Sequence, residues 1–334
     1  MVPSPHATDR HSFRLPANMD GFDPAFAAGP KAAGSLLLVG LLLAGTLAVV
    51  RTPVGSAKTV GTSRAGRFRM HDAGPTATRR VGRRPRLVSP SAIAVDAETG
   101  RVFIGNQPDR RMPVASLVKI MTALLVLEHG DLSATVVVSR RAAFTPPVSI
   151  GLRPGQRISV RALLYGMLLR SGNDAAMALA EHVSGSMSSF VTLMNERANE
   201  LGLSHTRFAD PAGLDDRGYG TARDLATLTR AALLVPAFTA IVNADRFVLR
   251  DGRRRARTLW NIDLFRGQYQ GAFGVKTGFT TRAGQCLVAA ARRNDRTLIA
   301  VVLGDSPATH WQDAFGDAAR LLDYGFAMSP SRLS

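Results

Sequence analysis

The chain has 334 residues, of which 46% are hydrophobic, and this content supports a sizeable core and excludes a fully disordered protein. The net charge of +17 is uneven, because residues 51–90 contain ten Lys and Arg against one acid, a local excess of +9. A lone Cys286 excludes an intrachain disulfide and a cysteine-rich zinc site. The scattered histidines have no metal-ligand spacing, so we expect neither a metal nor a cofactor.

The N-terminal part divides by composition. Residues 1–31 are polar without periodicity and are predicted to be disordered. Residues 32–50 carry no charge and approach the roughly 20 residues that cross a bilayer, which indicates a cleaved signal peptide or a retained membrane anchor. The arginines that follow oppose the usual charge asymmetry for exporting the C-terminal part. We nevertheless expect an extracytoplasmic protein, either secreted or anchored to the membrane by residues 32–50.

Residues 51–89 are rich in Arg, Pro and Gly, lack an apolar rhythm and are predicted to be a linker. Most such arginine runs are solvated spacers. Contact with anionic lipid or acidic wall polymers is a hypothesis for this segment. The absence of interleaved aromatic residues gives no support for nucleic acid as a partner.

Residues 90–328 have the pattern of one folded domain. Two short strands at 92–96 and 101–104 predict a hairpin. A helix over 113–130 is apolar around most of its circumference, which predicts a buried helix. Further helices are expected at 161–170, from after Asp174 to about 183, at 189–201, at 221–234 with Thr221 as N-cap, and at 311–324; apolar strands are expected at 272–276, 285–291 and 298–303. This order predicts an α+β fold in which the N-terminal hairpin joins the C-terminal strands in an antiparallel sheet covered by helices.

Ser116 and Lys119 begin the buried helix at a spacing that places two side chains on one face. Only four of the 42 basic residues are lysines, namely Lys31, Lys58, Lys119 and Lys276. Arginine does not lose its proton in a protein, whereas a desolvated lysine does, so Lys119 is a candidate base for Ser116. Taken alone, a Ser-x-x-Lys spacing also occurs by chance.

Two further short motifs carry polar side chains. Ser171-Gly172-Asn173 falls in a break between two predicted helices, where such residues are often caps. Lys276-Thr277-Gly278 is expected to close a strand, with the glycine marking a turn or a close backbone approach.

The three motifs together are those of the penicillin-binding proteins and class A β-lactamases, in the same order. Over residues 91–326 the chain resembles the D-alanyl-D-alanine carboxypeptidases, the low-molecular-weight penicillin-binding proteins. The strings AVDAETGRV, MPVASLVKIMTALL, LLRSGNDAA, FVTLMNERANELGL and GVKTGFTTRAGQCLVAAA carry the resemblance. It implies the serine β-lactamase/D,D-peptidase (transpeptidase-like) fold, with a five-stranded antiparallel sheet flanked by helices and an all-helical subregion.

The resemblance also implies a reaction, in which a serine attacks the bond between the two terminal D-alanines of a peptidoglycan stem peptide and forms an acyl-enzyme that water hydrolyses. β-Lactam antibiotics would then be covalent inhibitors. The implied catalytic residues are Ser116 as nucleophile, Lys119 as base and Ser171 as proton relay. The implied substrate-binding residues are Asn173 for the amide, Lys276 and Thr277 for the terminal carboxylate, Gly278 beside the peptide, and the backbone amides of Ser116 and Phe279 for the oxyanion.

This assignment makes a physical demand on Lys119. A base near pH 7 requires its pKa to fall by roughly 3 units from the ordinary value of about 10.4. Burial and a second cation at Lys276 are expected to supply the shift. The string FADPAGLDD has Asp210 where the resemblance leads us to expect Asn, which places the role of that side chain in doubt.

Three alternatives stay open at this point. A β-lactamase of the same fold is disfavoured for two reasons. Class A enzymes use a deacylating glutamate on a loop between the second and third motifs, whereas Glu181, Glu196 and Glu200 lie in predicted helices. Those enzymes also carry Asp between the Ser and the Asn of the second motif, where this chain has Gly172. A D,D-transpeptidase differs from a carboxypeptidase only in passing the acyl group to an amine instead of water. A non-catalytic wall-binding protein belongs to a different class, and labelled penicillin would distinguish it from an enzyme.

Overall fold

The computed structural model describes residues 83–250 and 256–328, all within one compact unit of the chain. The predictions for residues 1–31, for residues 32–50 and for nearly all of the 51–89 linker lie outside the described residues and stay predictions.

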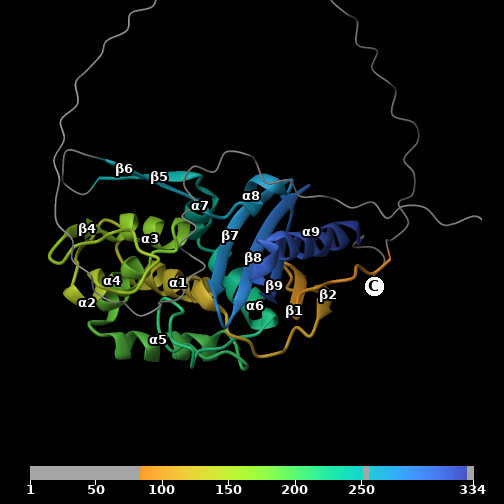
Figure 1. Cartoon of the computed structure of the whole chain (residues 1–334), viewed down its shortest axis with the longest axis horizontal. Coiled ribbons are helices and arrows are strands. Elements are labelled where there is room, and N and C mark those ends of the chain that lie inside the picture. The colour runs from red at the N-terminus through yellow and green to blue at the C-terminus, as the bar shows by residue number, and fades with distance from the viewer. Residues whose placement is uncertain (1–82, 251–255, 329–334) are drawn as a thin grey trace, which may run out of the picture. The chain divides into compact units, whose positions relative to one another are not determined.

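A five-stranded antiparallel sheet forms the centre of the fold (Figure 1). Its strands are β1 (Ser91–Asp96), β2 (Val102–Asn106), β7 (Ala272–Thr280), β8 (Gly284–Arg293) and β9 (Arg296–Asp305), in the order β2-β1-β9-β8-β7. Residue Ile93 of β1 pairs with Val301 of β9. The prediction that the N-terminal hairpin joins the C-terminal strands is therefore confirmed.

Both faces of the sheet are buried, which explains why β8 and β9 read as continuous apolar runs. On one face Leu287 and Val302 pack with Phe315 and Leu322 of α9 (Gln312–Ala327). Alternate residues of the same strands point to the opposite face and join the larger core. That core includes α1 (Lys119–His129), α6 (Ala222–Leu233) and α7 (Pro236–Asn243). The strand period of two thus divides one sheet between two helical layers.

The helical subregion surrounds α1, which is buried along nearly its whole length. Its other members are α2 (Arg140–Ala143), α3 (Val160–Leu169), α4 (Asn173–Ser184) and α5 (Met187–Glu200). Ser159 is the N-cap of α3, where its hydroxyl accepts a hydrogen bond from Ala162 N, and Thr221 is the N-cap of α6 as predicted. The α+β class and the all-helical subregion are confirmed.

The sequence did not predict the shortest elements. Two small sheets pair β3 (Thr135–Val137) with β4 (Arg157–Ser159) and β5 (Arg246–Leu249) with β6 (Arg257–Trp260). Helices α2, α7 and α8 (Phe265–Gln268) were also missed. Elements of three or four residues are too short to show a period, and the eight residues of α7 fall below the length at which a helical period is clear. Among the described residues no single helix is long and apolar enough to span a membrane, and only α6 and α7 together, bent by 105°, pass that test.

One predicted element differs in a way that affects the site. The single helix expected over 113–130 is a 3-10 turn (Ala115–Val118) followed by α1. Ala115 has φ 48°, an uncommon conformation for a residue with a side chain. Ser116 therefore lies in a tight turn before the α-helix and not in its first turn.

Candidate active site

The turn that carries Ser116 packs directly on β7. A Cβ added at Gly278 would lie 3.2 Å from both Ser116 N and Val114 O. Such distances are tighter than ordinary van der Waals contact, so a side chain at this position would push the turn away from the strand. Gly278 was expected to make room for a substrate. In the structure its missing side chain makes room for the backbone of the nucleophile's turn.

Lys119 makes three contacts through its amine. Its Nζ lies 2.8 Å from Ser116 Oγ, 2.8 Å from Asn173 Oδ1 and 2.6 Å from the carbonyl oxygen of Ala212. The amide oxygen and the carbonyl can only accept, so they take two N–H bonds. A neutral amine has just two hydrogens, and its lone pair is then left for the Ser116 hydroxyl. The geometry suits a base that removes a proton from Ser116.

The electrostatics favour that neutral form. Lys119 is fully buried, and burial followed by the nearby charge of Lys276 holds its pKa well below the usual value. Asp210 and Asp174 act in the opposite direction and raise the pKa of Lys119. Both expected causes, burial and a second cation at Lys276, thus lower the pKa of Lys119, with burial the larger contribution.

Lys276 is a second buried amine, 1% exposed, at the centre of β7. Its Nζ donates to Ser171 Oγ at 3.1 Å and to the Thr277 carbonyl at 2.7 Å. Burial lowers the pKa of Lys276 to about 8, and the carboxylate of Asp263 opposes that shift. The strand continues to Thr280, so the expectation that Lys276-Thr277-Gly278 closes it was wrong.

Ser171 and Asn173 flank the start of α4. Ser171 has φ 60° and is 6% exposed, and its hydroxyl accepts from Lys276. Asn173 is the first residue of the helix and not a loop residue. Its Oδ1 accepts from Lys119, and its Nδ2 donates to Pro146 O at 3.0 Å, which leaves one N–H of the amide for a further partner.

The next residue, Asp174, was not singled out from the sequence. Its buried carboxylate accepts from Ile150 N at 2.9 Å and from Leu152 N at 3.0 Å. Asn173 N in turn donates to Val148 O at 2.7 Å. Asp174 thereby fixes the segment against which Asn173 is oriented. The acid in the first turn of a helix was its only signal in the sequence.

Strand β7 lies at the edge of the sheet, because β8 is its one ladder partner within residues 83–250 and 256–328. One row of its backbone donors and acceptors therefore faces away from the sheet. Thr277 and Phe279 lie on this strand on either side of Gly278. A peptide could pair with that edge as an added strand beside Ser116.

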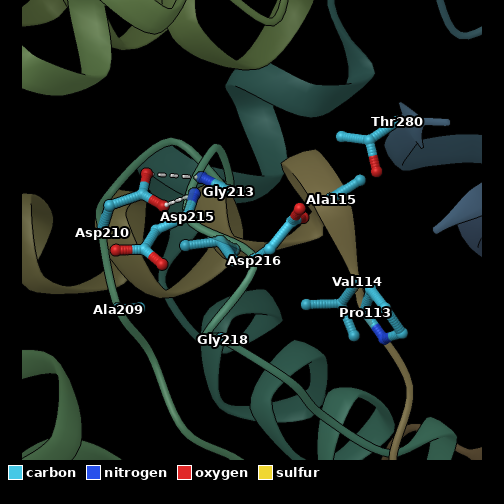
Figure 2. Close-up of a pocket in the computed structure, with 11 residues that line it drawn as sticks. Pro113, Val114, Ala115, Ala209, Asp210, Gly213, Asp215, Asp216, Gly218 and Thr280 are labelled. Carbon is cyan, nitrogen blue, oxygen red and sulfur yellow. Dashed lines mark hydrogen bonds between the residues drawn. The ribbon is translucent and has the colours of Figure 1, made fainter. Parts of the chain in front are cut away.

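The loop after Phe208 supplies the third contact of Lys119. Asp210 Oδ1 accepts from Ala212 N at 2.6 Å. It also accepts from Gly213 N at 2.7 Å, and Oδ2 accepts from Asp215 N at 2.6 Å, two bonds that Figure 2 shows. Two carboxylate oxygens suit three inward amides better than an amide side chain with one acceptor. The doubt about Asp210 is resolved in favour of a structural role, because it shapes the loop that presents Ala212 O to Lys119.

Figure 2 also shows a pocket between the Asp210 loop and the turn that carries Ser116. Its lining includes Val114, Ala115, Asp210, Gly213, Asp215 and Thr280. The pocket thus adjoins both the residue before Ser116 and the end of β7. Within residues 83–250 and 256–328, no three His, Cys, Asp or Glu side chains are grouped so that they could hold a metal ion.

Residues 116, 119, 171, 173 and 276 thus converge, although they come from three separate parts of the chain. A serine in contact with a buried lysine, beside an edge strand bearing Lys-Thr-Gly, defines the penicillin-binding class of serine acyl-transfer enzymes.

Comparison with known proteins gives the family. The profile described as D-alanyl-D-alanine carboxypeptidase matches residues 78–307. The chain belongs to this family of serine peptidases. It is 35% identical over 243 residues to D-alanyl-D-alanine carboxypeptidase DacF of Bacillus subtilis, covering 71% of this chain and 62% of the relative. It is 36% identical to DacB2 of Mycobacterium tuberculosis, covering 71% of this chain and 82% of that protein.

Solved structures agree on the fold. A D-alanyl-D-alanine carboxypeptidase of Mycobacterium tuberculosis has a TM-score of 0.70 and 32% identity, with 77% of this chain and 97% of that chain covered. A variant of the Streptomyces K15 DD-transpeptidase has a TM-score of 0.69 and 32% identity, with 73% of this chain and all of that chain covered. The serine β-lactamase/D,D-peptidase fold expected from the sequence is confirmed.

Proposed function

We propose that the protein is a serine-type D-alanyl-D-alanine carboxypeptidase that removes the terminal D-alanine of peptidoglycan stem peptides. The contact of Lys119 with Ser116, combined with the burial that lowers the pKa of the amine and favours its neutral form, carries the proposal. Family membership supports the reaction class. β-Lactams are proposed as covalent inhibitors, because they present a reactive carbonyl to the same nucleophile.

In the proposed mechanism Lys119 Nζ takes the proton of Ser116, and Oγ attacks the carbonyl carbon of the penultimate D-alanine. The amides of Ser116 and Phe279 are the proposed donors to the oxyanion, a role usually worth about 10² to 10³ in rate per donor. The C–N bond then breaks and D-alanine leaves with a proton delivered through Ser171. Water attacks the resulting ester in a second step and restores the Ser116 hydroxyl.

The proposed substrate contacts follow the charge of the site. Lys276, with Thr277 beside it, would bind the terminal carboxylate, and the unused N–H of Asn173 would bind the peptide amide. Gly278 lets the substrate strand and the nucleophile's turn share one short stretch of β7. The ammonium of Lys276 is needed for binding and the neutral amine of Lys119 for chemistry, so the two lysines have opposite requirements.

A D,D-transpeptidase is the second candidate, because the Streptomyces K15 DD-transpeptidase has the same fold at 32% identity. The two activities differ only in whether water or an amine accepts the acyl group. We also propose that the protein works outside the cytoplasm, with residues 32–50 as signal or anchor, because its proposed substrate is part of the wall.

Timed release of D-alanine from a peptide ending in D-Ala-D-Ala tests the proposal, with and without an amine acceptor. Release without the acceptor supports the carboxypeptidase, and a new amide product with it supports the transpeptidase. Absence of both, in folded protein, would contradict the proposal. The Ser116→Ala variant is the matched control and should give neither product.

A further inference from the structure

Thr122 is a buried polar residue that the mechanism has not used. It lies on α1, three residues after Lys119, and its side chain is fully buried. Its Oγ1 donates a hydrogen bond to Pro211 O at 2.8 Å. Apart from Lys119, the other buried residues of this helix are apolar. A hydroxyl among them is costly unless it is bonded, so the contact with Pro211 accounts for its place in the core.

Lys119 and Thr122 bind neighbouring carbonyls of one loop. Lys119 Nζ contacts Ala212 O at 2.6 Å, and Thr122 Oγ1 bonds to the carbonyl of the residue before it. A spacing of three residues places both side chains on one face of the helix, and the loop crosses that face. Pro211 and Ala212 are buried, so removal of the Thr122 donor would leave a buried carbonyl without this bond.

The same loop lies against the turn that carries Ser116. Gly213, which follows Ala212, has φ 82°. A Cβ added at Gly213 would overlap the carbonyl of Ala115 and would lie 3.1 Å from Ser116 N. Because only a hydrogen fits there, the backbones of the loop and of the turn are in direct contact. A displacement of the loop would therefore reach the nucleophile as well as the base.

We propose that Thr122 is a positioning residue for the reaction of Ser116, because it attaches residues 211–213 to α1. Asp210 bonds to amides of its own loop, so it shapes the loop without attaching it to the helix. The hydroxyl of Thr122 does not titrate, so its bond is the same whether Lys119 is neutral or charged. The loop thus keeps one fixed attachment while the amine gains and loses its proton.

The attachment acts on the chemistry through Lys119. With Ala212 O in place, the neutral amine gives one hydrogen to this carbonyl and one to Asn173 Oδ1, and its lone pair faces the Ser116 hydroxyl. If the loop moves away, the amine loses an acceptor and can turn its lone pair from the serine. A misplacement of about 1 Å is enough to lower a rate by about 100-fold. The inference rests on the proposed carboxypeptidase reaction, in which Lys119 is the base.

The first test is steady-state D-alanine release by Thr122→Val, which keeps the shape of the side chain and removes its donor. The hydrogen bond of Thr122 goes to none of the residues proposed to bind substrate. We therefore expect kcat to fall by about 10- to 100-fold while KM stays within about twofold. Acylation by a labelled penicillin should slow by a similar factor. Thr122→Ser keeps the hydroxyl donor and should recover most of kcat.

The matched control is Thr229→Val in α6. Thr229 is also fully buried, and its Oγ1 donates to Leu225 O of the same helix at 2.6 Å. This variant loses a buried hydroxyl away from the loop and should keep its kcat. Three results would overturn the inference: an unchanged kcat in folded Thr122→Val, a fall that Thr122→Ser does not recover, or an equal fall in Thr229→Val.

Two further arms keep the inference testable. If Thr122→Val does not fold, Thr122→Cys replaces it, because a thiol of similar size is only a weak donor. Its kcat should again fall with KM retained, and an unchanged kcat would overturn the inference. Amide hydrogen exchange over peptides spanning residues 209–216 needs no functional assay and should be faster in Thr122→Val than in Thr229→Val and the unmutated protein. Equal exchange in all three would contradict the attachment, whereas failure of D-alanine release by the unmutated protein would contradict the proposed function.

Discussion

Lys119 Nζ lies 2.8 Å from Ser116 Oγ, and its other two contacts are with groups that can only accept hydrogen bonds. A neutral lysine satisfies Asn173 Oδ1 and Ala212 O with its two hydrogens and keeps its lone pair for the serine. The protonated form would instead donate to Ser116 and block proton removal. The state of one proton on Lys119 therefore separates a reactive site from an inert one.

Replacement of Lys119 by Arg should remove the proton acceptor while keeping a long, positively charged side chain at this position. Arginine stays protonated, so kcat/KM should fall by about 10² to 10⁴, the usual contribution of a general base. Steady-state D-alanine release measures this. The matched control is Lys58→Arg, the same exchange in the predicted linker, which should leave the rate unchanged. Equal rates for Lys119→Arg and the unmutated protein would exclude Lys119 as the base.

The pH dependence should be bell-shaped. Lys119 must be neutral, so the rate should fall as pH drops through its lowered pKa. Lys276 must be charged, so kcat/KM should also fall as pH rises through about 8. Initial rates between pH 5 and about 10 in buffers of constant ionic strength would measure both limbs. A flat profile across this range contradicts the opposite requirements of the two lysines.

The close approach at Gly278 predicts a sharp effect of one methyl group. In Gly278→Ala the new Cβ would meet backbone atoms of the Ser116 turn at 3.2 Å, so the turn must move. We expect a loss of about 1–3 kcal/mol in the free energy of unfolding and a large fall in kcat. Gly267→Ala is the control, because a Cβ there meets nothing within 4 Å. Similar behaviour of the two variants in chemical denaturation and turnover would contradict the packing argument.

Asp210→Asn should act on both structure and chemistry. The amide loses one acceptor and presents a donor to a backbone N–H, at a cost of about 1–3 kcal/mol in stability. Removal of the negative charge should also lower the pKa of Lys119, and the acidic limb of kcat/KM should move to lower pH. Asp216→Asn, an exposed acid in the same loop, is the control. An acidic limb that stays in place or moves upward would contradict this account.

The buried carboxyl group of Asp305 should make the free energy of unfolding depend on pH. Its side chain is 2% exposed and Oδ1 has no partner among the described residues, and burial raises its pKa to about 7. Ser89 Oγ lies 2.9 Å from Asp305 Oδ2 and 2.7 Å from Asp317 Oδ2, and a single hydroxyl cannot donate to both. A protonated Asp305 can donate to Ser89. Because the folded pKa is raised, the native state binds the extra proton, and this contribution to stability is lost as pH rises through about 7.

Asp305→Asn supplies the missing donor at every pH. The variant should be more stable than the unmutated protein at pH 8.5, by about 1–3 kcal/mol, and should lose the difference at pH 5. Thermal and urea unfolding at the two pH values measure this. The control is Asp295→Asn, an exposed acid in the turn between β8 and β9. Lower stability of Asp305→Asn at pH 8.5 would contradict the protonated network.

The long elements and the nucleophile's partner were predictable because they leave local patterns. The buried helix and the apolar strands are continuous hydrophobic runs of distinct lengths, and Ser116 and Lys119 are three residues apart. The 3-10 turn was not predictable, because it depends on the contact between Gly278 and the backbone of Ser116, which are far apart in the chain. Likewise Asp210 acts through the backbone amides of its loop, and it has no spacing that sets it apart from ordinary loop acids.

Covalent trapping with a labelled penicillin tests the central claim most directly, that a neutral Lys119 activates Ser116. The folded protein should gain the mass of one penicillin, located to the peptide that contains Ser116, and the adduct should be absent in Ser116→Ala and strongly slowed in Lys119→Arg. Absence of an adduct on the unmutated protein, or an adduct that persists in folded Ser116→Ala, would contradict the account.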